Sequence, residues 1–486
     1  MKNYKAGFSI FYIASILLVI YIMGTAHANN KNTFPKLINS TELDSVLVKS
    51  ETIYNEYCSG CHGEFMEDFV DREWKFGDSD EEIFKSIAEG RASDEMPAFN
   101  SLLSQQEVKD LIVKIRHKTS NIDENDLKRE SEDFEIYKSS DFNFRLEEVV
   151  NDLESPWGMV FLTNGDLLVT DKSGELWRVK KDKSKIEIEG VPNVLYKGQG
   201  GLLDIELHPN FSENSWLYLS YSISKREAGQ RLSSTAVSRY KLQGNSLVDG
   251  KLIFEALPYS NRRHHYGSRL EFDDEGYLYI TVGDRGEREV NPQNLSLYPG
   301  KVHRVFENGR IPEDNPFVNK PGVVKSVFSY GHRNAQGMIK NPITGEIWTH
   351  EHGPKGGDEI NIIKKGANYG WPVVSFGINY DGTIFTNLTA KEGMEQPLHY
   401  WTPSIAPSGM DFVRGKIYPG WEGHLLVGSL RFEYLKLCKI DGKKVVSEEI
   451  LLEDIGRVRN VKQGPDGYLY VAVEDPGTIY KIIPLK

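Results

Sequence analysis

The chain has 486 residues, of which 39% are hydrophobic and 26% are charged, as in ordinary globular proteins. This length exceeds that of one typical domain and predicts about two to four domains. The formal net charge of −12 argues against nucleic acid as a partner, because binding the phosphate backbone requires a basic surface. The 44 glycines and 24 tyrosines suit a β protein that is rich in turns.

Residues 1–28 have the pattern of an export signal. Lys2 and Lys5 form a short basic start, residues 8–23 are almost wholly apolar, and residues 26–28 read Ala-His-Ala, a small-x-small cleavage pattern. The apolar run is long for a signal peptide, so an uncleaved membrane anchor is the alternative. We therefore expect a periplasmic or otherwise exported protein.

Residues 58–62 read Cys-Ser-Gly-Cys-His, the signature of covalent c-type haem attachment. The thiols of Cys58 and Cys61 add to the two vinyl groups of one porphyrin, and His62 brings an imidazole beneath the iron. A zinc site would need a second ligand pair, and the remaining cysteine, Cys438, is distant and has no partner beside it. The absence of a βαβ context argues against a thioredoxin-like dithiol. The motif predicts haem c, and hence one-electron chemistry outside the cytoplasm.

Residues 45–118 are expected to form a small helical domain around this haem. The sequences Ser-Asp-Glu-Glu at 79–82 and Ser-Gln-Gln-Glu at 104–107 are capping boxes that open two helices. The loop between them contains Met96-Pro-Ala-Phe, and a methionine there could cross over the haem as the sixth iron ligand. Met66 is the competitor, but it is too close to His62 in sequence to reach the opposite face easily. With its C-x-x-C-H motif and Met-Pro-Ala-Phe loop, this region resembles class I c-type cytochromes.

Residues 119–143 are polar and mixed in charge, and we interpret them as a linker. From residue 144 to the end, the sequence changes to short apolar strands separated by glycine-containing turns. Six such units recur, beginning near residues 164, 216, 275, 344, 423 and 466. Repeated β units of this size favour a β-propeller, with residues 146–150 completing the last blade. An open array of β-sandwich sheets is the alternative.

Five clusters of polar residues interrupt these units. Their sequences are Gly198-Gln199-Gly-Gly, His264-His265-Tyr-Gly-Ser-Arg, Gly331-His-Arg333-Asn334-Ala-Gln-Gly, residues 350–359 (His-Glu-His-Gly-Pro-Lys-Gly-Gly-Asp-Glu), and Arg431 with Arg457-Val-Arg459. The acidic, glycine-rich cluster at 350–359 could offer oxygen ligands to a hard cation, or its two histidines could bind zinc. The arginines suggest a ligand with several carboxylates. The residues alone therefore indicate a dehydrogenase whose organic cofactor passes electrons to the haem.

In their sequences and their order along the chain, these clusters resemble those of the soluble PQQ-dependent glucose dehydrogenases and the related aldose sugar dehydrogenases. Further matching segments are Asn368-Tyr-Gly-Trp-Pro and Gly456-Arg-Val-Arg. This resemblance covers residues 144–486 and implies a six-bladed propeller, in agreement with the number of units. It also implies that His265 takes the proton from the C1 hydroxyl of an aldose while a hydride passes to the C5 carbonyl of PQQ.

The resemblance implies further roles for residues around that reaction. Arg333 matches the residue beside the reacting carbonyl, and Asn334 and Gln199 match its polar neighbours. Three arginines match the cations that hold the carboxylates of PQQ: Arg431, Arg457 and Arg459. The carbonyls of Gly353 and Pro354 match ligands of the calcium ion that polarises the cofactor, and Glu359 and Tyr369 match ligands of a second, structural calcium.

Two residues depart from the glucose dehydrogenase pattern. His264 replaces an aspartate beside the base, so the residue that adjusts the proton affinity of the base in the glucose dehydrogenases is missing at this position. Arg431 replaces a lysine, keeping the charge but changing the geometry. Both departures resemble the broader aldose dehydrogenase branch, so glucose is not implied as the substrate. The segments 222–235 and 380–396, which we interpret as specificity loops, match nothing recognisable.

The sequence therefore predicts an exported aldose dehydrogenase with haem c, PQQ and calcium as cofactors. Its partners would be an aldose sugar and a downstream electron acceptor, such as a cytochrome or a respiratory chain. A lactonase-like hydrolase or a sugar-binding module, joined to an electron-carrier cytochrome, is the alternative. A hydrolase of that kind predicts carboxylate and asparagine ligands on the channel axis, where the sequence instead places arginines.

Overall fold

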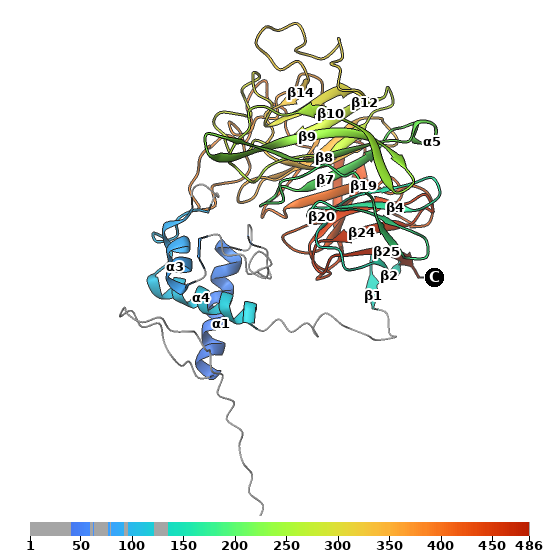
Figure 1. The fold of residues 1–486 in the computed structure, drawn as a ribbon. Coiled ribbons are helices and arrows are strands. Elements are labelled where there is room, and N and C mark those ends of the chain that lie inside the picture. Colours follow the sequence, from blue (N-terminus) through green and yellow to red (C-terminus); the bar gives the residue numbers. More distant parts are fainter. Residues whose placement is uncertain are drawn as a thin grey trace, which may run out of the picture. The chain divides into compact units, whose positions relative to one another are not determined.

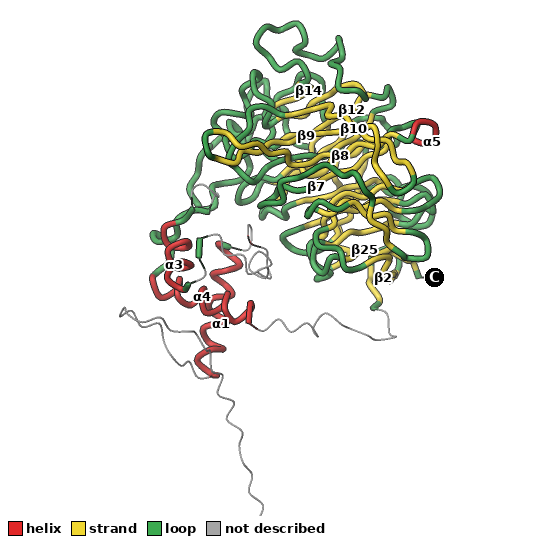
Figure 2. The backbone as a smooth tube through the Cα atoms, in the orientation of Figure 1, coloured by secondary structure: helices red, strands yellow, loops and turns green. Residues whose placement is uncertain are grey.

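The computed structural model describes residues 40–58, 62, 76–77, 79–91, 96–120 and 135–485. Figures 1 and 2 show helices in the N-terminal part of the chain and strands in the remainder, with one short helix, α5 (Phe211–Asn214), among the strands. The predicted export segment, Cys61, Met66 and residues 121–134 of the predicted linker lie outside the described residues. Among the described helices, none combines the length and the hydropathy that a membrane span requires.

Three helices form the N-terminal part: α1 (Ser40–Tyr57), α3 (Asp80–Glu89) and α4 (Gln105–Ser120). Their apolar faces share one small core, in which Tyr54, Ile83 and Leu111 are almost fully buried. Both predicted capping boxes are present. Ser79 and Glu82 exchange side-chain and backbone hydrogen bonds at the start of α3, and Ser104 and Glu107 do the same at the start of α4.

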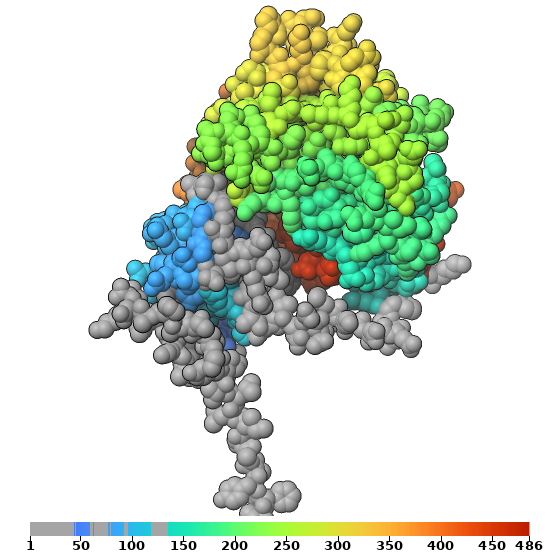
Figure 3. Space-filling view, in the orientation of Figure 1, coloured from blue at the N-terminus to red at the C-terminus, as the bar shows by residue number. Residues whose placement is uncertain are grey.

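The strands of the C-terminal part form six antiparallel sheets, as the sequence predicted. The first sheet contains β3 (Pro156–Phe161), β4 (Leu167–Asp171), β5 (Leu176–Val179) and β6 (Lys185–Glu187). The second contains β7 (Leu202–Leu207), β8 (Trp216–Glu227), β9 (Gln230–Gln243) and β10 (Ser246–Glu255). The third contains β11 (Leu270–Phe272), β12 (Tyr277–Val282), β13 (Lys301–Phe306) and β14 (Val327–Tyr330). Figure 3 shows the propeller surface, with the yellow β13–β14 region projecting at one edge.

The fourth sheet contains β15 (Ala335–Lys340), β16 (Ile347–Glu351), β17 (Asp358–Ile362) and β18 (His399–Trp401). The fifth contains β19 (Pro407–Phe412), β20 (Leu425–Ser429), β21 (Leu435–Asp441) and β22 (Lys444–Leu452). In the sixth, β23 (Val458–Gln463), β24 (Leu469–Val473) and β25 (Thr478–Pro484) are joined by β2 (Asn143–Val150) and β1 (Ile136–Lys138).

Strand β2 closes the ring, because it comes from the start of the propeller and pairs with β25 at its end. Leu146 lies opposite Ile482, which confirms the predicted closure by residues 146–150. Strand β1 lies inside the segment that the sequence assigned to the linker. It is held there because Tyr137 stacks on Phe144 with ring centroids 5.7 Å apart.

The first strand of each complete sheet lines a central channel. A cavity of about 20 Å³ on the channel axis is lined by residues from all six of these strands, among them Met159, Glu206, Glu271, Met338 and Lys462. A cavity of this size has room for roughly one water molecule. The interior of the channel is therefore packed, and a ligand larger than a water molecule would have to bind at one of its ends.

The repeat pattern identified the middle strands of the sheets better than the inner ones. Predicted segments such as 167–171 and 469–473 are fully buried strands. Residues 222–235, interpreted as a loop, instead form the far ends of β8 and β9, which pair as far as Glu227 and Gln230.

Replacing Phe144 with alanine tests the closure of the ring. Phe144 is fully buried and packs edge-to-face against Trp421 at 5.9 Å, so we expect a loss of about 3–5 kcal/mol in unfolding free energy. Urea unfolding followed by tryptophan fluorescence measures this loss. Ile343→Ala, at a side chain that is 78% exposed, should change it by less than about 0.5 kcal/mol. Equal effects of the two substitutions would contradict a structural role for β2.

Candidate functional site

The five polar clusters occupy one end of the propeller ring. Gln199 precedes β7, His265 precedes β11, Arg333 precedes β15, and Arg457 and Arg459 flank the start of β23. The β16–β17 connection, which contains Gly353 and Pro354, reaches the same end because Ala335 pairs with Glu351 across β15 and β16. Antiparallel sheets therefore bring together residues that are separated by up to 260 positions in the sequence.

His265 is held in a strained backbone conformation. It has a φ of +53°, a left-handed value that few non-glycine residues adopt. Its backbone N–H donates to Gln199 Oε1 at 2.7 Å, which gives the predicted polar neighbour a definite role. The ring is 7% exposed and packs edge-to-face with that of His264, at a centroid distance of 4.7 Å.

The carboxylate of Asp284 fixes the ring of His265. Its Oδ1 lies 2.6 Å from His265 Nδ1, and its Oδ2 accepts a hydrogen bond from Trp371 Nε1 at 2.8 Å. Burial alone would raise the pKa of Asp284, but the charges of His265 and Arg333, together with its hydrogen bonds, hold this pKa below its ordinary value. His265 therefore has a carboxylate partner in Asp284, although His264 replaces the aspartate that the glucose dehydrogenase pattern has beside it.

Arg333 is held by a second buried carboxylate. Glu351 Oε2 accepts the backbone N–H of Arg333 at 2.6 Å, and Glu351 Oε1 lies 2.9 Å from Nδ1 of the buried His332. The guanidinium group donates to the carbonyl of His352 at 3.3 Å. The backbone carbonyl of Arg333 in turn accepts the N–H of Asp284 at 2.7 Å, so Asp284 connects the two predicted catalytic residues, His265 and Arg333.

Asn334 offers a donor that matches a bound ligand. Its side chain is fully buried, and Oδ1 accepts the backbone N–H of Gly267 at 3.1 Å. Its Nδ2 is buried and has no hydrogen-bond partner among the described residues. A buried unpaired donor is costly, and such atoms in native sites commonly face a ligand or an ion. This residue therefore fits the polar cofactor that the sequence predicted.

Two of the three predicted arginines share one carboxylate. Arg459 Nε donates to Glu474 Oε1 at 2.7 Å, and Arg457 Nε donates to Glu474 Oε2 at 3.1 Å. Burial alone would raise the pKa of Glu474, but the charges of Arg459, Arg457 and Lys172 hold it well below its ordinary value. These two guanidinium groups and one carboxylate carry a net charge of +1, so they favour an anionic ligand.

Arg431 follows β20 of the fifth sheet, next to the sheet that contains Arg459. Its Nη1 donates to the carbonyl of Ser404 at 3.2 Å, and its Nε is buried without a hydrogen-bond partner among the described residues. Like Asn334, it presents a donor that a bound group can satisfy.

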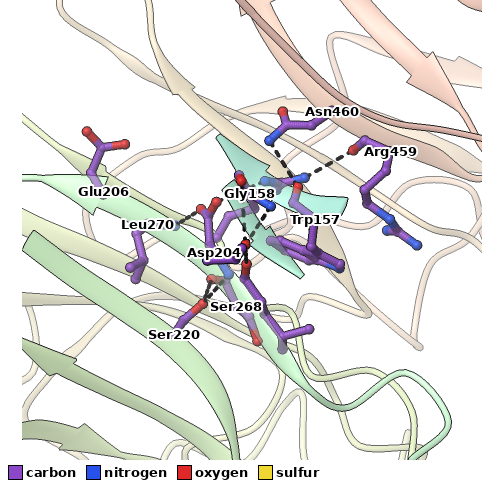
Figure 4. Close-up of polar contacts among 12 residues, drawn as sticks. Trp157, Gly158, Asp204, Glu206, Ser220, Ser268, Leu270, Arg459 and Asn460 are labelled. Atoms are coloured by element: carbon purple, nitrogen blue, oxygen red, sulfur yellow. Dashed lines mark hydrogen bonds and ion pairs between the residues drawn. The ribbon is translucent and has the colours of Figure 1, made fainter. Parts of the chain in front are cut away.

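The arginines rest on a polar network at the top of the channel. Arg269 Nη1 donates to Asp204 Oδ1 at 3.0 Å, and its Nη2 donates to the carbonyl of Arg459 at 3.3 Å. Figure 4 shows Asp204 directed towards Leu270, whose N–H it accepts, and Asn460 directed towards the carbonyl of Trp157. The inner strands of four sheets are therefore connected by hydrogen bonds beneath the site.

Asp358 organises the predicted calcium segment. Its carboxylate accepts the N–H of Gly353 at 2.7 Å and those of Ile405 and Ala406 at 2.7 and 2.9 Å. Burial raises the pKa of Asp358 to about 6 despite these hydrogen bonds. A Cβ atom at Gly353 would collide with the backbone of Gly356 and Gly357, so this turn requires glycine.

Metal ligation receives less support from the side chains. In the part of the chain that the structure describes, no three His, Cys, Asp or Glu side chains converge in a way that could hold a metal ion. A zinc site at His350 and His352 therefore has no ligand set, and calcium at Gly353 and Pro354 would depend on backbone carbonyls and on the cofactor itself. The hydroxyl of Tyr369 donates to the carbonyl of Ile362 at 2.5 Å.

Glu359 lies beside another carboxylate. Burial and the charge of Glu351 raise the pKa of Glu359 to about 8, and its Oε2 accepts Asn361 Nδ2 at 3.1 Å. A nearby cation would relieve this repulsion, but the second calcium site stays a prediction.

The haem residues lie in the helical domain. The N–H of His62 donates to the carbonyl of Cys58 at 3.0 Å, so the first and last residues of the attachment motif lie close together. Tyr54 donates through its hydroxyl to the carbonyl of His62 at 3.2 Å. Cys58 and Met96 both pack against the core of the three helices. A thiol, an imidazole and a thioether around one core fit the haem that the motif predicts.

Replacing Glu474 with glutamine tests the arginine pair. The buried guanidinium group of Arg459 and the partly exposed one of Arg457 would then lack their counter-charge, so we expect a loss of roughly 3–5 kcal/mol in unfolding free energy at pH 7. Because the folded-state pKa of Glu474 is depressed, its stabilisation is complete above the unfolded pKa of about 4.3 and falls as pH drops below it. Urea midpoints at pH 7 and pH 3.5 should therefore differ less between variant and wild type at the lower pH. A difference that is independent of pH would contradict this assignment.

Comparison with known proteins agrees with this arrangement. Residues 153–481 match the family model described as Glucose / Sorbosone dehydrogenase, and residues 47–113 match the model described as Cytochrome C oxidase, cbb3-type, subunit III. The aldose sugar dehydrogenase YliI of Escherichia coli is 40% identical over 345 residues, which cover 69% of this chain and 92% of that protein. Quinoprotein glucose dehydrogenase B of Acinetobacter calcoaceticus is 26% identical over 71% of this chain and 88% of its own length.

Solved structures show the same relationship. The apo form of the soluble aldose sugar dehydrogenase from Escherichia coli aligns with a TM-score of 0.67 and 38% identity, over 70% of this chain and all of that chain. The PQQ-bound aldose sugar dehydrogenase of Streptomyces coelicolor aligns with a TM-score of 0.57 and 28% identity, over 70% of this chain and 97% of that chain. The chain thus belongs to the glucose/sorbosone dehydrogenase family of oxidoreductases, and it carries a cytochrome c domain on the N-terminal side of its six-bladed propeller.

Proposed function

We propose that the protein is an exported quinoprotein that oxidises the C1 hydroxyl of aldose sugars to lactones and passes the electrons to its own haem c. The pairing of His265 with Asp284 beside a set of arginines is the observation that carries this proposal. The resemblance of the clusters and the names of the relatives point to aldoses as the substrate class.

His265 is suited to take the proton from the C1 hydroxyl. Because Nδ1 donates to the Asp284 carboxylate, the lone pair of the neutral ring is on Nε2, and Asp284 stabilises the imidazolium that forms. Asp284 is itself fixed by Trp371 and by the N–H of Gly286, at 2.8 Å each. The base thus needs little reorganisation when the proton moves.

PQQ, when bound, would supply a carbonyl that accepts the hydride from C1. Arg431, Arg457 and Arg459 would hold its carboxylates, and Asn334 would donate to one of its oxygens. Arg333, which is coupled through its backbone to Asp284, would place a positive charge beside the reacting oxygen. The carbonyls of Gly353 and Pro354 would hold the calcium ion at the cofactor.

The cytochrome domain provides the route for electrons. Cys58, Cys61 and His62 would hold haem c, and Met96 would supply the sixth ligand, which raises the reduction potential of the iron. Since c-type haem is attached outside the cytoplasm, we also propose that residues 1–28 direct export to the periplasm or beyond. The reduced haem would then pass electrons to a further cytochrome or to a respiratory chain.

Reconstitution tests the proposal directly. Purified full-length protein is loaded with PQQ and calcium, aldoses are added, and the haem absorption spectrum is followed. We expect the haem to be reduced by aldoses only in the presence of PQQ. If no aldose reduces the haem while a chemical reductant does, the proposed function is wrong.

Substitutions at the base should separate proton removal from cofactor binding. His265→Ala and Asp284→Asn should each lower turnover by roughly 10²–10⁴-fold, the usual contribution of general base catalysis. PQQ affinity, measured by fluorescence titration, should stay close to that of the wild type. Turnover equal to the wild type in His265→Ala would remove His265 as the base.

Met96→Ala tests the sixth ligand of the haem. The variant should bind haem covalently but lose the near-infrared band of histidine–methionine ligation, and its reduction potential should fall. PQQ-dependent sugar oxidation with a small artificial acceptor should not change. An unaltered near-infrared band would point to another ligand, such as Met66.

A further inference from the structure

Tyr380 brings an unassigned side chain to the reaction centre. Its hydroxyl oxygen accepts from Arg333 Nη2 at 3.4 Å, and it belongs to the segment 380–396 that the sequence analysis interpreted as a specificity loop without assigning a role to any of its residues. Arg333 is also coupled to the base, because its carbonyl accepts the N–H of Asp284 at 2.7 Å and Asp284 holds His265. Tyr380 therefore contacts the guanidinium group that the proposed function places beside the reacting oxygen.

The turn that carries Tyr380 is attached to the site at several points. Lys355 and Ile378 exchange backbone hydrogen bonds of 3.0 and 3.1 Å, which fasten the turn to the Gly353–Pro354 segment. A Cβ atom at Gly377 would collide with the carbonyl of Gly356, so the two backbones are in close contact.

The far side of the same turn is equally constrained. Arg288 Nη1 donates to Asn379 Oδ1 at 2.7 Å. The N–H of Asn379 donates to the carbonyl of Thr383 at 2.9 Å, and Asp381 accepts both the N–H and the hydroxyl of Thr383. A side chain on such a rigid turn can discriminate among ligands, because little conformational entropy is lost when a ligand binds.

The chemistry of the side chain matches a sugar. A tyrosine presents an apolar ring face, which can cover the C–H face of a pyranose, and a hydroxyl that both donates and accepts. A tyrosine hydroxyl whose oxygen accepts a hydrogen bond, as that of Tyr380 does from Arg333, is also able to donate its proton to a sugar oxygen. At 3.4 Å this contact is longer than a typical hydrogen bond, so rearrangement around a ligand would cost little.

We propose that Tyr380 determines sugar specificity: its ring forms a wall of the sugar pocket, and its hydroxyl hydrogen-bonds a sugar hydroxyl other than the one at C1. This inference rests on the proposed function, since it assumes that an aldose reacts beside Arg333 and His265. It assigns the choice among aldoses to the turn at residues 379–383, which is separate from the residues that remove the proton.

Tyr380→Phe provides the test, because it removes the hydroxyl and keeps the ring. Steady-state rates of the PQQ- and calcium-loaded protein are measured with a small artificial acceptor, so that the haem is bypassed. Loss of one hydrogen bond should raise KM for the preferred aldose roughly 2–12-fold with little change in kcat. The substrates are the preferred aldose and its deoxy analogues, each lacking one hydroxyl.

The deoxy series identifies the partner of Tyr380. The analogue that lacks the contacted hydroxyl should have the same KM with wild type and Tyr380→Phe, while the others show the full ratio. The 1-deoxy sugar, which cannot be oxidised at C1, should bind more weakly to the variant by the same factor in calorimetry. Tyr277→Phe, a half-buried tyrosine at the opposite end of β12 from Asp284, is the matched control and should change neither quantity.

Three results would overturn the inference. An unchanged KM for every sugar would show that the hydroxyl makes no contact. An equal change for all analogues, in kcat and not in KM, would show that Tyr380 acts only by positioning Arg333. If the wild type oxidises no aldose at all, the proposed function fails, and the inference fails with it.

Discussion

The pairing of β2 with β25 is the constraint on which the site depends. The groups around the reaction centre come from the ends of different sheets, and their positions are defined only when those sheets form a closed ring. Closure is achieved by a strand that enters the last sheet from the beginning of the propeller, with Leu146 opposite Ile482. Because no sheet edge then opens at the junction, the inner strands can converge on one channel without extra covering elements.

Buried carboxylates set the geometry at this end of the ring. Asp284 orients the ring of His265, Glu351 holds the backbone of Arg333, and Asp358 holds Gly353. Glu474 serves the arginine pair in the same way. In each case one anion accepts several hydrogen bonds, so a functional group is fixed by a residue that need not touch the substrate. This arrangement explains why the site is preorganised although its residues are far apart in sequence.

The fold and the cluster residues were predictable because their signals are local. Short buried strands such as 469–473 follow glycine-containing turns, and C-x-x-C-H is a short sequence motif with fixed spacing. Asp284, Glu474 and Tyr380 were missed because their roles exist only across sheets or between loops. Asp284 had a signal that could have been used: it follows the buried strand β12, whose end must meet the start of β11 near His265. Tyr380 lay in a segment interpreted as a specificity loop, but its contact with Arg333 had no sequence signal, since Arg333 is 47 positions away.

The covalent connection of the two domains has a physical consequence under the proposed function. Oxidation at C1 releases two electrons, while a haem accepts one at a time. Each turnover therefore requires two successive one-electron transfers to the haem. Residues 121–134 connect Ser120 to Glu135, and at about 3.3–3.6 Å per residue they can span at most roughly 50 Å. A tether of this length keeps the acceptor at an effective concentration of about millimolar. Once the haem has passed the first electron to a downstream acceptor, it can take the second without a new acceptor having to diffuse to the propeller.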